Sequence, residues 1–175
     1  PALREILVLM GPGTLGVAAT QFNVYVNTVL ATGQEAGAVS WLNYAFRIMY
    51  LPIGLFGVSL ASASLPLIST HAAREDFAAV RRTLGHALRL VLSLTVPATF
   101  GLVALGVPIV RLIFERGRFE ASDTQAVALA LMAYSPGLVG YSAVKVLSPT
   151  FYALRDSRTP VIVSVMAVLT NAALN

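Results

Sequence analysis

Two basic side chains stand in otherwise apolar stretches of this sequence, Arg47 and Lys145. A guanidinium group presents its donors as a fork that matches the oxygens of a phosphate or pyrophosphate. No carboxylate lies within one helical turn of Arg47 to neutralise it. In a polar cavity Arg47 would therefore bind an anion. At a membrane surface, among Trp41, Tyr44 and Tyr50, which resemble an aromatic belt, it would instead act as an anchor. Lys145 could also reach such a surface with its long side chain.

Uncharged amides form a second set of polar residues in apolar surroundings. Thr20, Asn23 and Asn27 are spaced i, i+3, i+7 and therefore share one face of a helix. Asn171 and Asn175 are one helical turn apart. Amide oxygens are hard ligands that suit an alkali cation. Spacing alone does not separate a cation site from interhelical hydrogen bonds or from the polar wall of a cavity.

The sequence contains no constellation for covalent catalysis. There is no cysteine, and the two histidines, His71 and His86, fall in one predicted loop region. The predicted spans carry no carboxylate, and there is no glycine-rich loop of the kind that cradles phosphates. We therefore expect neither an enzyme, nor a metal site built on protein ligands, nor a bound cofactor.

The composition predicts a membrane protein. Hydrophobic residues make up 57% of the 175 residues, charged residues only 11%, and the mean hydropathy is +0.76. A soluble domain carries about 25% charged residues, and one core of this size could not hide so much apolar surface. The net charge is +4, but the Lys and Arg residues are not spaced along one polar helix face. This argues against nucleic acid as a partner.

Charge-free stretches divide the chain into five predicted membrane-spanning helices, over about 6–32, 40–70, 88–113, 124–153 and 160–175, the last incomplete. The stretches 90–110 and 124–144 are each about 31 Å long as helix, close to the bilayer core of about 30 Å. Apolar residues at helical spacing between the second and third spans predict a separate helix over about 75–86, lying on the membrane surface.

Loop charges predict the orientation. The loops on the side of the first residue carry seven Lys or Arg residues and those on the other side carry three. The positive-inside rule therefore places the first residue on the cytoplasmic side. Prolines within the spans, such as Pro52 and Pro136, predict kinks. Gly57 and Ala61 form a small-xxx-small pair, which predicts a close helix–helix contact.

Several blocks of sequence resemble the family of bacterial lipid II flippases (MurJ, also called MviN). The longest is SWLNYAFRIMYLPIGLFGV over residues 40–58. Shorter ones are QFN at 21–23, LPLIS at 65–69, FERGRF at 114–119, and KVL with FYA between 145 and 153. The blocks follow the family's order over nearly the whole chain.

The resemblance implies an all-α polytopic bundle, a segment of about helices 7 to 11 of a fourteen-helix transporter. That transporter would belong to the multidrug/oligosaccharidyl-lipid/polysaccharide exporter superfamily, with two lobes that alternate access to a central cavity. It would move an undecaprenyl-pyrophosphate-linked peptidoglycan precursor to the outer leaflet of the bacterial cytoplasmic (inner) membrane. Its partners would be this lipid-linked oligosaccharide, membrane lipids and the missing lobe of the same polypeptide. Arg47 matches a cavity arginine that engages the pyrophosphate, with Lys145 as a second substrate-binding candidate.

The chain departs from the family's pattern at two places. Many members carry Asp before the matching arginine and an acidic residue or Gln three positions after it, where this chain has Phe46 and Tyr50. Some members bind sodium at positions that match Asn27, Asn171 and Asn175, where amides here replace acidic ligands. Because amides carry no charge to offset the ion, the resemblance alone does not imply that this chain binds sodium. Coupling of transport to sodium or to the membrane potential remains open, with Thr20 and Asn23 facing the cavity.

Two other functions remain open on the sequence. One is a cation-coupled polysaccharide or drug exporter of the same superfamily, for which a drug antiporter would usually need a titratable carboxylate in the cavity. The other is a membrane scaffold without transport activity, in which Arg47 and the amides would only pack or anchor.

Overall fold

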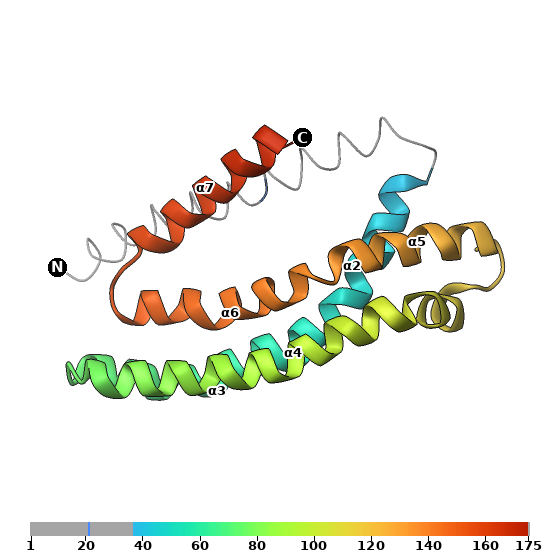
Figure 1. Ribbon diagram of the computed structural model, residues 1–175. Coiled ribbons are helices and arrows are strands. Elements are labelled where there is room, and N and C mark those ends of the chain that lie inside the picture. Colours follow the sequence, from blue (N-terminus) through green and yellow to red (C-terminus); the bar gives the residue numbers. More distant parts are fainter. Residues whose placement is uncertain (1–20, 22–36, 175) are drawn as a thin grey trace. The chain divides into compact units, whose positions relative to one another are not determined.

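The computed structural model describes Gln21 and residues 37–174 (Figure 1). This part of the chain consists of helices without a strand, which confirms the all-α prediction. The helices belong to two compact units, of which one comprises residues 37–150 and the other contains residues 151–174. Most of the predicted first span lies outside the described residues, as do Thr20, Asn23, Asn27 and Asn175.

The first long helix combines three segments, α2 (Ala38–Pro52), the π-helical η1 (Ile53–Val58) and α3 (Ser59–Ala73). Together they form 36 residues, apolar and long enough to cross a membrane, and they contain the predicted span 40–70. Pro52 has no N–H group to donate to the preceding turn, and the π-helical segment begins directly after it. Figure 1 shows the helix changing direction between α2 and α3.

The second long helix, α4 (Phe77–Phe114), is continuous over 38 residues, about 57 Å. The prediction of a separate surface helix over about 75–86 is therefore wrong. Asp76 caps the helix by accepting a hydrogen bond from the backbone N–H of Ala79 at 2.9 Å. One buried stripe then runs through both predicted elements without a break, because its residues recur at helical spacing: Val80, Ala87, Val91, Thr95, Leu102, Gly106 and Val110.

The predicted span 124–153 corresponds to two helices, α5 (Ala121–Tyr134) and α6 (Gly137–Ala153), bent by 52° at the break between them. Pro136 lies in this break and cannot donate a backbone hydrogen bond. The hydroxyl of Thr99, on α4, donates to the carbonyl of Ser135 at 3.3 Å. A neighbouring helix thus pairs with the backbone where the helical hydrogen bonds are interrupted, as apolar surroundings require.

Helices α2, α4 and α5 enclose the main core of the unit formed by residues 37–150. The tight turn at 74–76 places α4 beside α3 (Figure 1), and a second, smaller core lies between these two helices and Val146 of α6. Both residues of the predicted small pair lie at helix–helix contacts. Gly57 approaches α6 so closely that an added Cβ would lie 3.2 Å from the Cα of Ser142, and Ala61 is buried in the second core.

The helix α7 (Arg158–Leu174) belongs to the other unit. Asp156 precedes it and accepts hydrogen bonds from the backbone N–H groups of Arg158 and Thr159 and from the Thr159 hydroxyl. The bonds from Thr159 are the largest cause of the lowered pKa of Asp156. Within the described residues, two helices are long and apolar enough to span a membrane, with the bent α5–α6 pair as a third candidate. Helix α7 is a shorter apolar helix.

Candidate functional site

Helix α2 places Arg47 on an open surface of its unit. The helix buries one face through Ala45, Ile48 and Met49, which pack into the main core. Near its start, Trp41 donates a hydrogen bond from Nε1 to Oδ1 of Asp123 on α5 at 2.8 Å. These contacts fix the rotation of the helix, so the residues between the buried positions point outward and Arg47 is exposed.

A cluster of three aromatic rings joins α2 and α6, and one of them, Phe46, directly precedes Arg47 in the sequence. Phe46 and Tyr50 are one turn apart on α2, with ring centroids separated by 5.7 Å. Tyr141 on α6 meets both of them edge-on, at 6.4 Å from Phe46 and 6.4 Å from Tyr50. Each ring is about 40% exposed, so the rings form a surface rather than a core.

Lys145 joins this surface from α6. Its ammonium nitrogen lies over the ring of Tyr141, 5.2 Å from the centroid, which is the geometry of a cation–π contact. The five residues Phe46, Arg47, Tyr50, Tyr141 and Lys145 are called the basic–aromatic patch below.

The patch carries positive charge that the described residues do not neutralise. Within residues 37–171, neither Arg47 nor Lys145 forms an ion pair or a side-chain hydrogen bond, whereas Arg111 pairs with Glu115 at 3.1 Å. A guanidinium and an ammonium beside exposed aromatic faces suit a ligand that combines a phosphate with a flat, partly apolar ring. The described residues include no group of three or more His, Asp or Glu side chains that could hold a metal ion.

Of the two basic residues that the sequence singled out, Lys145 contacts Tyr141, whose ring meets Phe46 and Tyr50, and Arg47 is exposed on α2 directly after Phe46. Of the three residues of the predicted aromatic belt, Trp41 and Tyr44 are half-buried and pack against the main core, whereas Tyr50 is exposed. Asn171 is half-buried on α7, in the other unit. Since Asn27 and Asn175 lie outside the described residues, the sodium site stays a prediction.

The comparisons with known proteins agree with this arrangement of helices. The family model described as "Lipid II flippase MurJ" matches residues 1–175. The chain belongs to the MurJ family. A probable lipid II flippase MurJ of Vibrio cholerae serotype O1 is 34% identical over 175 residues, which cover 100% of this chain and 33% of that protein. The lipid II flippase MurJ of Burkholderia cenocepacia is 36% identical over 165 residues, covering 94% and 32%.

A solved structure has the same fold. It is described as lipid II flippase MurJ in an inward closed conformation and matches with a TM-score of 0.82 and 31% sequence identity. The match covers 95% of this chain and 35% of the solved one. The chain thus spans about a third of the length of its MurJ relatives, and its helices are part of a multi-span membrane transporter fold.

Proposed function

We propose that the chain is part of a lipid II flippase, which moves an undecaprenyl-pyrophosphate-linked peptidoglycan precursor from the inner to the outer leaflet by alternating access. In this proposal the basic–aromatic patch contacts the precursor. Arg47 binds the pyrophosphate through its fork of donors, and Lys145 adds a second positive charge. The remaining two thirds of the transporter, absent from this chain, supply the other wall of the cavity.

One observation carries the proposal beyond family membership. Arg47 is exposed on a helix whose other face is fixed in the core, and no described residue neutralises it. An exposed positive side chain without an ion-pair partner can bind an anionic ligand at a lower free-energy cost, because no ion pair has to be broken first.

The location and orientation are part of the same proposal. The chain lies in the bacterial cytoplasmic (inner) membrane, with its first residue and the turn between α3 and α4 on the cytoplasmic side. The excess of basic residues in the loops on that side supports this orientation. In this proposal transport is coupled to sodium or to the membrane potential.

The test compares Arg47→Ala and Arg47→Lys in the full-length parent protein at matched membrane expression. Flipping is measured in cells as the fraction of precursor that an externally added enzyme can cleave. We expect Arg47→Ala to lower the flipping rate by about tenfold or more, because a charge-assisted contact is lost. Lysine should restore little of it, since an ammonium cannot form the two parallel bonds of a guanidinium.

The control is Arg81→Ala, which removes the same charge from an exposed position on α4. It should leave the flipping rate unchanged. Normal flipping in both Arg47 variants would contradict a role of Arg47 in substrate binding and leave it as a surface anchor.

A further inference from the structure

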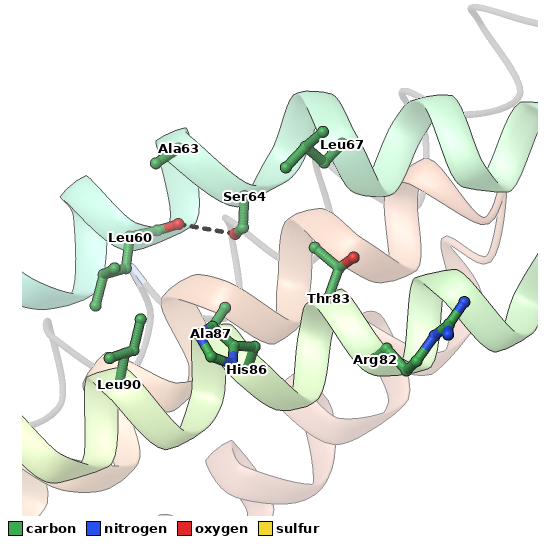
Figure 2. A pocket seen from close by; sticks show the side chains of 9 residues that line it. All are labelled: Leu60, Ala63, Ser64, Leu67, Arg82, Thr83, His86, Ala87 and Leu90. Atoms are coloured by element: carbon green, nitrogen blue, oxygen red, sulfur yellow. Dashed lines mark hydrogen bonds between the residues drawn. The ribbon is translucent and has the colours of Figure 1, made fainter.

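A groove of about 460 Å³ runs between α3 and α4, on elements that do not contribute to the basic–aromatic patch. Figure 2 shows Leu60 on α3 facing Leu90 on α4, with Leu67 farther along α3 and with Arg82 and His86 farther along α4. The lining is mostly apolar, and the groove is open along its length.

Both basic residues of the groove lie toward one of its ends. Arg82 and His86 are one turn apart on α4, toward the turn at 74–76, whereas Leu90 and Leu60 lie together at the opposite end (Figure 2). Leu90 is about 12 Å farther along α4 than Arg82. The groove therefore has one end with basic residues, which Leu67 also lines, and an opposite end lined by leucines without a basic residue, which suits the polarity of a lipid molecule.

The basic end has no partner among the described residues. Neither Arg82 nor His86 forms an ion pair or side-chain hydrogen bond within residues 37–171. The nearby carboxylate of Asp76 is engaged in capping α4 through the N–H of Ala79. Both basic side chains are exposed, so they can meet a ligand without rearrangement of the helices.

The position of the groove along the helices matches the edge of a bilayer. The charge-free stretch of α4 begins at Leu90, which marks the boundary of the hydrocarbon core. His86 lies about 6 Å and Arg82 about 12 Å beyond that boundary, and headgroups occupy roughly the first 5–8 Å. The long side chain of Arg82 can reach back to this depth.

We propose that this groove is a binding site for an anionic phospholipid. The phosphate contacts Arg82 and His86 beside Leu67, and an acyl chain leaves the groove between Leu60 and Leu90 into the hydrocarbon core. Basic pockets between membrane helices at the headgroup level recognise anionic lipids in this way, because positive charge and apolar contact coincide only there. The site lies on a different helix pair from the patch, so the proposal does not depend on the role of Arg47.

The test uses the full-length parent protein in detergent, titrated with phosphatidylglycerol or with phosphatidylcholine of the same chains and followed by native mass spectrometry. We expect phosphatidylglycerol to be preferred. Arg82→Gln should weaken its binding about fivefold, the effect of one basic residue at a membrane surface. Arg81→Gln, which removes the same charge one residue outside the groove, should stay within about twofold of the wild type.

A second variant narrows the groove beside its basic residues without changing charge. Leu67→Trp places a larger side chain in the groove at a position that is 57% exposed, so the fold should tolerate it. It should weaken phosphatidylglycerol binding while the thermal stability stays that of the wild type. Equal losses in Arg82→Gln and Arg81→Gln, no preference for phosphatidylglycerol, or unchanged binding in Leu67→Trp would each overturn the proposal.

Discussion

At the residue scale, one carboxylate organises the connection between α4 and α5. The hydroxyl of Thr124 donates to Oε2 of Glu115 at 2.7 Å, and Nε of Arg111 donates to the same oxygen at 3.1 Å. Both bonds stabilise the charged carboxylate and lower the pKa of Glu115 below its ordinary value of 4.5, with Thr124 as the larger cause.

Removing the Thr124 hydroxyl should change how stability depends on pH. Because the folded-state pKa of Glu115 is lowered, its contribution is present above the unfolded pKa and is lost as the pH falls through the folded pKa. When the pH falls from about 6 to about 3, the melting temperature of the full-length protein should therefore drop less in Thr124→Val than in the wild type. Thr70→Val, whose hydroxyl bonds only within α3, is the control. Identical pH profiles in Thr124→Val and the wild type would contradict this role.

The chemistry of single residues was predictable from the sequence, but their surroundings were not. Arg47 and Lys145 stood out because a charge in an apolar stretch needs a reason. Their common surface depends on Tyr141 meeting Phe46 and Tyr50, which come from α6 and α2. No local pattern specifies a contact between helices so far apart in the chain.

At the element scale, two glycines in the same helix have different surroundings and allow a matched test. An added Cβ at Gly57 would lie 3.2 Å from the Cα of Ser142, whereas at Gly54 it would meet nothing within 4 Å. Both substitutions gain the same helix propensity, so their difference isolates the contact.

We expect Gly57→Ala to be less stable than Gly54→Ala by about 1–3 kcal/mol, the usual effect of overpacking. The measurement is the melting temperature of the full-length protein in one detergent. Equal melting temperatures in the two variants would show that η1 and α6 do not pack as closely as the structure has them.

The elements themselves were predictable where length and charge decide them. The described helices cover the predicted spans 40–70, 88–113 and 124–153, and Pro136 lies where the last one bends. The prediction of a surface helix over about 75–86 was wrong because an apolar face that contacts lipid has the same sequence pattern as one that contacts protein. Leu84 and Leu88 pack against the smaller core between α3 and α4, a partner that periodicity alone cannot reveal.

At the scale of the whole molecule, the proposed orientation makes the two ends of α4 accessible from opposite sides. The sequence has no cysteine, so single ones can be introduced into this segment of a cysteine-free parent. Ala78→Cys and Ser122→Cys place thiols at exposed positions near the start of α4 and of α5.

In cells with a permeabilised outer membrane, a membrane-impermeant maleimide should label Ser122→Cys at once and Ala78→Cys only after lysis. The reverse pattern would invert the proposed orientation. Lysed cells, in which both positions should react, provide the control for accessibility of the thiols.

The central claim is that the lipid-linked precursor touches the basic–aromatic patch, and site-specific photocrosslinking tests it most directly. The photoreactive amino acid p-benzoylphenylalanine would replace Tyr50 in the patch or Phe100, an aromatic residue on α4 that is 70% exposed. After irradiation of cells that express the full-length protein, we predict a crosslink to the precursor from position 50 and none from position 100. A crosslink of equal yield from both positions, or none from position 50 in a variant that still flips, would contradict the account.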